Sequence, residues 1–184
     1  MPVVLRIFSQ NLFAMKSLSR SMPSLNQALS ILMIPSSGEA QSAAYWLEKG
    51  NELCNSGLLD EAIKAYEQAL KIDRSLVDAW NNEGLALASM GRFEPALNCF
   101  DEVIKLSAQH KHALSNKGMV LAQQKKYPEA LGYFEAAIAA DPYFAGAWYN
   151  MALTMQCMGR NKEAMAAMKT AKTLDGSAGR CCRR

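Results

Sequence analysis

The same residue types return every 34 positions through most of this 184-residue chain. Five columns each recur four times: Ala62, Ala96, Ala130 and Ala164; Trp46, Trp80, Leu114 and Trp148; Gly50, Gly84, Gly118 and Ala152; Tyr66, Phe100, Phe134 and Met168; Ala69, Val103, Ala137 and Ala171. They divide the sequence into the units 43–76, 77–110, 111–144 and 145–178. A period of this length indicates stacked copies of one supersecondary unit.

The unit 77–110 shows what each copy contains. "VDAWNNEGLALASM" predicts a first helix, and Gly91 follows it at a position that suits a helix C-terminus. "EPALNCFDEVIKLS" predicts a second helix, with Pro95 in its first turn, where a missing N–H costs little. The small Gly84 and Ala96 allow the two helices to approach closely. Because one such pair cannot bury its apolar face alone, neighbouring pairs must stack. The sequence therefore predicts an all-α protein, an α-solenoid of antiparallel helix pairs.

These columns resemble the tetratricopeptide repeat, a helix–turn–helix unit with this same period. The resemblance covers about 43–176 and implies a right-handed superhelix whose first helices line a concave groove. The third unit departs from the pattern with Leu114 for tryptophan and Lys125 for the usual turn glycine. In the fourth, Asn161 and Met168 replace aromatic residues.

The segment 1–42 does not show the full repeat and is treated as an N-terminal extension. Three interpretations stay open: a mobile extension, a targeting segment, or a degenerate half-repeat, since Ala28 stands one repeat period before Ala62. We expect a cytoplasmic protein, or a mitochondrial or exported one if 1–42 is a targeting segment. At the other end, we expect 179–184 to be a disordered basic tail that carries Cys181 and Cys182; whether these cysteines are modified stays open.

Charge and cysteine usage exclude several classes of function. The net charge of +3 lies in the tails, because 43–175 carries 14 basic and 16 acidic residues. No nucleic-acid partner is therefore expected for the repeats. The five cysteines form no CxxC pair, which argues against a disulfide framework and a zinc site. Cys54, Cys99 and Cys157 are expected to be buried or half-buried. No apolar run is long enough for an integral membrane segment.

Catalytic residues are not evident in the sequence. The two histidines, His110 and His112, fall at the junction of the second and third units without a cysteine or carboxylate at ligand spacing. We find no serine-nucleophile motif and no glycine-rich phosphate loop. The sequence therefore predicts no enzyme, no cofactor and no metal site.

A candidate binding surface follows from helical geometry. At about 100° per residue, Asn82 lies about 200° around its helix from Trp80, on the side away from the packing. The same stripe carries Glu48, Asn116 and Asn150 at the repeat period. An amide can donate to and accept from a peptide backbone at once. The groove residues that we expect to contact a partner are Asn51, Asn82, Leu85, Asn116, Met119, Tyr149, Asn150 and Leu153. Alternatively, the asparagines hydrate the groove or bond a neighbouring helix.

Some proteins of the resembled family hold a chaperone's C-terminal carboxylate with asparagines and cations on this stripe. Asn51 and Asn82 match those asparagines, whereas Leu47, His112 and Asn116 stand where lysine or arginine would be needed. A carboxylate would lose its charge-assisted hydrogen bonds here, so the sequence argues against this clamp.

The sequence thus predicts an interaction module or scaffold that binds a protein or peptide of unknown identity in its groove. The alternative is a self-associating protein, a homo-oligomer. We expect the chain to end without a capping helix beyond 162–174, which would leave Met165 and Met168 partly exposed for self-association.

Overall fold

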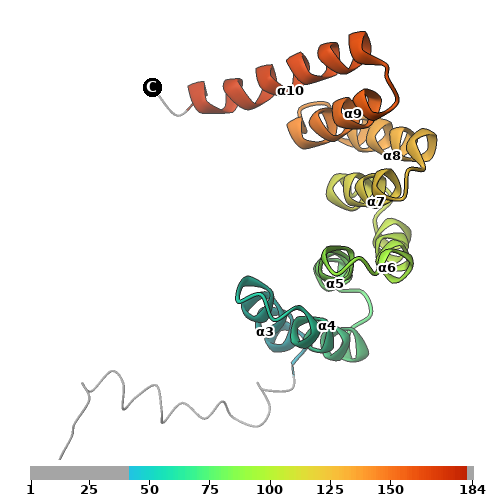
Figure 1. Cartoon of the computed structure of the whole chain (residues 1–184). Helices are drawn as coiled ribbons and strands as arrows, with labels where there is room; N and C mark the ends of the chain where they lie inside the picture. Colours follow the sequence, from blue (N-terminus) through green and yellow to red (C-terminus); the bar gives the residue numbers. More distant parts are fainter. Residues whose placement is uncertain (1–41, 182–184) are drawn as a thin grey trace, which may run out of the picture. The chain divides into compact units, whose positions relative to one another are not determined.

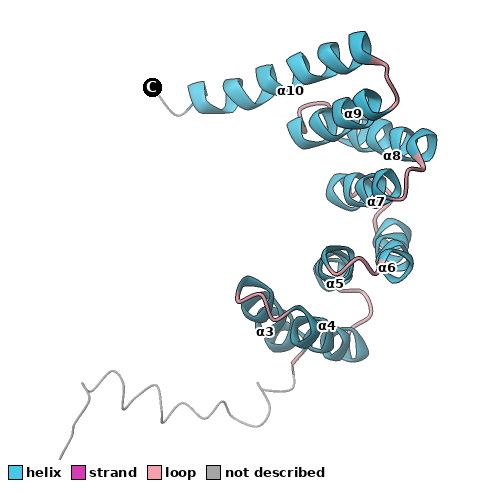
Figure 2. Cartoon of the chain, viewed as in Figure 1, coloured by secondary structure: helices cyan, strands magenta, loops and turns pink. Residues whose placement is uncertain are grey.

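A computed structural model describes the backbone of residues 42–181 and the side chains of 42–175. Within this range all regular structure is helical, which confirms the all-α prediction (Figure 2). The helices are α3 (Ala43–Asn55), α4 (Leu59–Ile72), α5 (Val77–Ser89), α6 (Phe93–Leu106), α7 (Lys111–Gln123), α8 (Tyr127–Ala140), α9 (Ala145–Cys157) and α10 (Asn161–Cys181). The expectations for the segment 1–41, and for the last three residues, lie outside the described residues.

Consecutive helices pack as pairs, two to each predicted unit: α3 with α4, α5 with α6, α7 with α8, and α9 with α10 (Figure 1). Each second helix also contacts the first helix of the next unit. The first helices α3, α5, α7 and α9 contact one another in turn, whereas second helices of different units do not among the described residues. The first helices therefore make a continuous layer, and the predicted binding stripe lies on that layer.

The turns inside the units rest on backbone conformations that suit glycine. Gly57, Gly91 and Gly159 adopt φ angles of +77°, +73° and +76° between the two helices of their units. Lys125 occupies the same position in the third unit and adopts φ +61°, so the turn is kept without the glycine. A side chain with a Cβ is disfavoured there, which makes this turn the strained one of the four.

The core of each of the first three units forms where a glycine of the first helix meets an aromatic ring of the second. Tyr66, Phe100 and Phe134 are at most 1% exposed and are among the largest fully buried side chains. A Cβ on Gly84 would lie 2.7 Å from the ring of Phe100. That is closer than atoms pack in a protein interior. In the fourth unit Ala152 replaces the glycine and Met168 replaces the ring. The unbranched methionine adapts to the additional methyl group.

The last helix is longer than the sequence predicts. The expected range is 162–174, and α10 extends from Asn161 to Cys181, so helix reaches into the segment that we expected to be a disordered tail. Alanine, lysine and methionine favour helix through 174, and nothing as strongly helix-breaking as proline follows. In the described part of the chain, no helix combines the length and the apolar character needed to cross a membrane.

Candidate partner-binding surface

The asparagines of the predicted stripe hydrogen-bond between neighbouring units. The side-chain amide of Asn82 donates to Asn51 Oδ1 at 2.9 Å, from α5 to α3. The hydroxyl of Tyr66 donates to the same oxygen at 2.9 Å. Asn116 on α7 donates to Asn81 Oδ1 at 3.1 Å, and Asn81 donates to Asn82 Oδ1 at 3.3 Å. One continuous network of side-chain hydrogen bonds therefore connects the first three units.

The fourth unit uses a hydroxyl in the equivalent place. The side-chain amide of Asn150 donates to Ser115 Oγ at 3.3 Å, and Ser115 is 3% exposed. Each of the three repeating asparagines thus turns its NH2 group toward the preceding unit. This arrangement agrees with the alternative that the asparagines bond a neighbouring helix. It leaves the side-chain carbonyl oxygens of Asn116 and Asn150 without a protein donor among the described residues.

Sequence reasoning missed two members of this arrangement, Asn81 and Ser115. Each directly precedes a stripe asparagine, and the helical phase alone places it between the stripe and the packed side of its helix. The adjacent pair "NN" at 81–82 is the sequence feature that could have indicated the link. A repeat period shows which residues share a phase but does not show which neighbour each side chain reaches.

An apolar pocket opens on the same layer between the third and fourth units. Its volume is about 210 Å³, and its lining includes three of the predicted groove residues, Met119, Asn150 and Leu153. Tyr127 and Phe134 contribute from α8, and Cys157 contributes from the end of α9. Leu153 is 38% exposed, so an apolar side chain faces solvent at the pocket mouth. Exposed apolar surface in a concave site is typical of a binding site.

The predicted Tyr149 lies at a second pocket, between α9 and α10. This pocket has a volume of about 350 Å³ and includes Asn150, Met168, Lys172 and Asp175 in its lining. Tyr149 is 47% exposed. Asn150 lines both pockets, so the two apolar openings meet at one residue of α9. Leu85 is half-buried and packs against the core, while Asn51 and Asn82 belong to the amide network.

Charged residues pair differently at successive junctions between units. Lys117 on α7 forms an ion pair with Asp101 on α6, and its ammonium lies 4.6 Å from the centre of the Tyr133 ring. Burial alone would lower the pKa of Lys117, but its hydrogen bonds with Asp101 and Tyr133 raise that pKa above its ordinary value.

One junction earlier, the residue at the position of Lys117 is Glu83. It is 8% exposed, and the residue at the position of Asp101 is Glu67. Burial raises the pKa of Glu83 to about 7, the Glu67 carboxylate raises it further, and Arg92 opposes the rise. The second junction is therefore held by an ion pair, whereas the first contains two like charges.

The two histidines perform local roles. His110 caps α7, because its Nδ1 accepts a hydrogen bond from the Ala113 N–H at 3.1 Å. The exposed His112 lies edge-on to Phe144, with 4.9 Å between ring centres. Its partial burial and the neighbouring Lys111 lower the pKa of His112. The neutral form of this histidine therefore predominates at pH 7.

Cysteines and carboxylates assemble no metal centre in 42–175. No group of three or more His, Cys, Asp or Glu side chains within that range is arranged to hold an ion. Cys99 is buried and Cys54 half-buried, as expected. The expectation for Cys157 was wrong: it is exposed, because it lies at the open end of α9.

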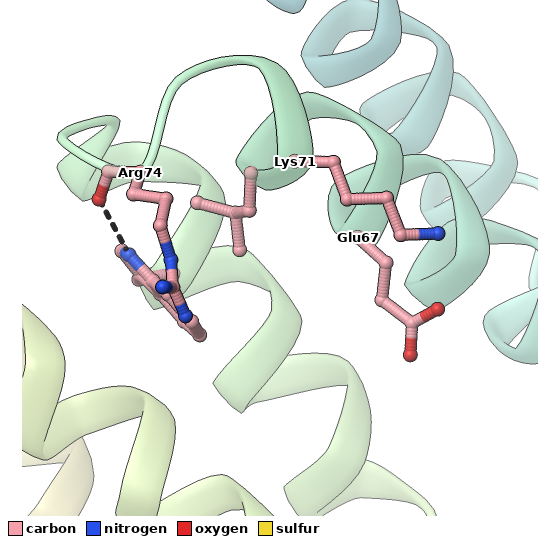
Figure 3. Close-up of a pocket in the computed structure, with 5 residues that line it drawn as sticks. Glu67, Lys71 and Arg74 are labelled. Carbon is pink, nitrogen blue, oxygen red and sulfur yellow. Dashed lines mark hydrogen bonds between the residues drawn. The ribbon is translucent and has the colours of Figure 1, made fainter.

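A cavity at the first junction lies on the other side of α5, away from the stripe. It is about 400 Å³ in volume and is lined by Glu67, Leu70, Lys71, Arg74 and Trp80. Figure 3 shows the Arg74 side chain lying apart from those of Glu67 and Lys71. The Trp80 indole N–H donates to the Arg74 carbonyl oxygen at 2.9 Å, the dashed line in that view. Trp148 makes the same bond to the Pro142 carbonyl at 3.1 Å, so this contact secures both Trp80 and Trp148 to the preceding loop.

The chain belongs to the tetratricopeptide-repeat family. Three overlapping family models match the chain. One is described as TPR repeat and matches 50–91, and two are described as tetratricopeptide repeat and match 81–143 and 121–176. The family and the α-solenoid architecture predicted from the sequence are both confirmed. Proteins of this class are typically non-catalytic scaffolds for other proteins.

Similar solved structures share the fold. A crystal structure of MamA has a TM-score of 0.69 at 20% identity, covering 75% of this chain and 81% of that one. MamA 41-end from Desulfovibrio magneticus RS-1 has a TM-score of 0.65 at 29% identity, covering 73% and 76%. The first TPR of Spaghetti (RPAP3), bound to the HSP90 peptide SRMEEVD, has a TM-score of 0.62 at 23% identity, covering 65% and 95%. A comparison with curated proteins gave no match.

Proposed function

We propose that this protein is a non-catalytic binding module that takes up a segment of another protein on the layer formed by α5, α7 and α9. The observation that carries the proposal is the apolar pocket between α7 and α9, with the partly exposed Leu153 at its mouth. A protein-interaction role is common to the family. The RPAP3 structure, solved with a bound peptide, supports the idea that a fold of this kind accommodates a peptide.

The amide network supports the same surface in another way. Because Asn82 and Asn116 bond across unit junctions, they hold the first helices in register before any partner arrives. A preformed surface avoids part of the ordering cost of association, which favours affinity. The asparagines therefore stabilise the surface itself. We also propose that Asn82, Asn116 and Asn150 contact a partner directly.

The test is a matched pair of charge insertions. Leu153→Glu places a carboxylate at the pocket mouth, whereas Leu106→Glu places one at the end of α6, where Leu106 is 46% exposed. Both positions are exposed, so both variants should keep their helical content by circular dichroism. Partners are captured with the parent chain, identified by mass spectrometry, and their affinities for the two variants measured. We expect Leu153→Glu to weaken binding at least tenfold and Leu106→Glu to leave it unchanged. Equal affinities for the two variants would contradict the proposal.

A specific observation favours a second candidate, self-association through the last unit. Met165 on α10 is 74% exposed and lines a cavity of about 470 Å³ with Ala152, Gln156, Asn161, Ala164 and Met168. This is the face of α9 and α10 on which a further unit would stack. A second copy of the chain is the occupant that this alternative proposes.

A further inference from the structure

The predicted binding stripe has an unequal distribution of charge along the layer of first helices. It carries exposed carboxylates at Glu48 on α3 and Asp78 on α5. No position of the stripe holds a lysine or an arginine: its other members are Ala44, Asn51, Asn55, Asn82, Leu85, Ser89, His112, Asn116, Met119, Gln123, Gly146, Asn150, Leu153 and Cys157. The end of the stripe at the first two units is therefore acidic, and the end at the last two has no carboxylate and includes the apolar Met119 and Leu153.

The register of the helices places the two carboxylates at the same level of adjacent first helices. Asn82 on α5 bonds Asn51 on α3, which sets those two residues opposite one another. The two helices run in the same direction, because a returning helix separates them. Glu48 and Asp78 each lie about one turn before these asparagines. They flank the same end of the amide network, and neither has an ion-pair partner among residues 42–175.

The direction of the hydrogen bonds adds to this polarity. The NH2 groups of Asn82, Asn116 and Asn150 each donate one hydrogen bond to the preceding unit. The acceptors left for a partner are carboxylate oxygens at one end and the side-chain carbonyl oxygens of Asn116 and Asn150 toward the other, and each of these NH2 groups keeps one N–H beyond the hydrogen bond that it makes. A partner that supplies N–H donors and positive charge fits such a surface, and one that ends in carboxylates does not.

We infer, on the basis of the proposed function, that the partner segment is cationic at one end and apolar at the other. A lysine or arginine binds between Glu48 and Asp78, and an apolar side chain enters the pocket beside Leu153. Two spacings of packed first helices separate these places, about 20 Å. An extended chain covers that distance in about six residues. The charge of this segment is therefore opposite to that of the acidic peptide SRMEEVD bound to the RPAP3 repeat.

The probe is a phage-displayed library of random 12-residue peptides selected on the full chain. We expect enriched peptides to carry Lys or Arg about six positions from Leu, Met or Phe, with Asp and Glu below their input frequency. The dissociation constant of such a peptide, measured by fluorescence anisotropy, should increase with salt concentration. Glu48→Gln combined with Asp78→Asn should weaken binding about threefold to tenfold, as expected for two exposed ion pairs.

The outcomes separate this inference from the proposed function. Enrichment of acidic or uncharged peptides that lose affinity for Leu153→Glu would overturn the inference and leave the binding surface intact. An unchanged dissociation constant in the Glu48→Gln, Asp78→Asn variant would also overturn the inference. Enriched peptides that bind the parent and Leu153→Glu equally, or no enrichment at all, would contradict the proposed surface and the inference with it.

Discussion

The contact between a glycine and an aromatic ring decides how closely the two helices of a unit approach. A Cβ on Gly118 would lie 2.8 Å from the Phe134 ring and 3.1 Å from the Ala130 carbonyl oxygen. The ring is fully buried and belongs to the hydrophobic core. Gly132 lies exposed on α8, and a Cβ there would meet nothing within 4 Å. The two glycines should therefore respond to substitution in opposite ways.

Gly118→Ala should lower the free energy of unfolding by about 1–3 kcal/mol, the usual cost of overpacking a core. Gly132→Ala should raise it by up to about 1 kcal/mol, because alanine is the better helix former. Urea denaturation followed by circular dichroism measures both. Adding Phe134→Met to Gly118→Ala should recover part of the loss, since that combination reproduces the Ala152 and Met168 of the fourth unit. Equal destabilisation by the two glycine variants would show that packing against the ring is not the cause.

Helices of adjacent units meet at junctions that differ in electrostatics although their registers are the same. At a pH well below the ordinary pKa of a glutamate, Glu83 is protonated in both the folded and the unfolded chain. As the pH rises, the unfolded chain ionises first, because burial in the folded state raises the pKa of Glu83 to about 7. The free energy of unfolding therefore decreases as the pH rises from the ordinary pKa to the raised pKa of Glu83. Above the raised pKa this contribution changes no further. The first junction should be weakest in alkaline solution.

Glu83→Gln removes this pH-dependent loss. Its melting temperature should exceed that of the parent by several degrees at pH 8, from a stabilisation on the order of 2–3 kcal/mol, and should match the parent at pH 4. Glu67→Gln is the control: it removes the second charge but leaves Glu83 buried, so its gain should be smaller. Thermal melts monitored by circular dichroism at both pH values decide the matter. A melting difference for Glu83→Gln that does not change with pH would contradict the role of ionisation.

Periodicity predicts the elements well because each helix boundary occurs several times in the sequence. Gly57, Gly91 and Gly159 fall at the same phase, and the turn survives at Lys125, where only the register indicates it. The end of α10 has no such repetition, so its predicted boundary falls too early. The hydrogen bonds between the asparagine side chains are a similar case. Helical phase places Asn82 on the stripe, but the link from α5 to α3 depends on the offset between stacked units, which a single period does not contain.

On the scale of the whole molecule, the two ends of the described repeats present unlike surfaces. α3 begins with a serine cap, in which Ser42 accepts from the Tyr45 N–H at 3.1 Å, and it carries the exposed Lys49–Glu52 pair. The face of α9 and α10 presents methionines beside alanines. Unlike ends do not by themselves form a two-fold contact, whereas the methionine face can meet its own copy around a two-fold axis. Self-association, where it occurs, should therefore give a dimer that closes on itself.

Met165→Lys tests this geometry, because it places a charge at the centre of the methionine face while its exposed position spares the fold. If the face associates, the parent's mass by light scattering should fall from dimer to monomer across a hundredfold dilution, and the variant should stay monomeric throughout. Tyr143→Ser is the matched control, since Tyr143 is 80% exposed in the loop before α9 and away from that face; it should follow the parent. A parent of constant monomer mass would remove self-association. A variant as dimeric as the parent would place the contact elsewhere and leave the layer of first helices as the surface to examine.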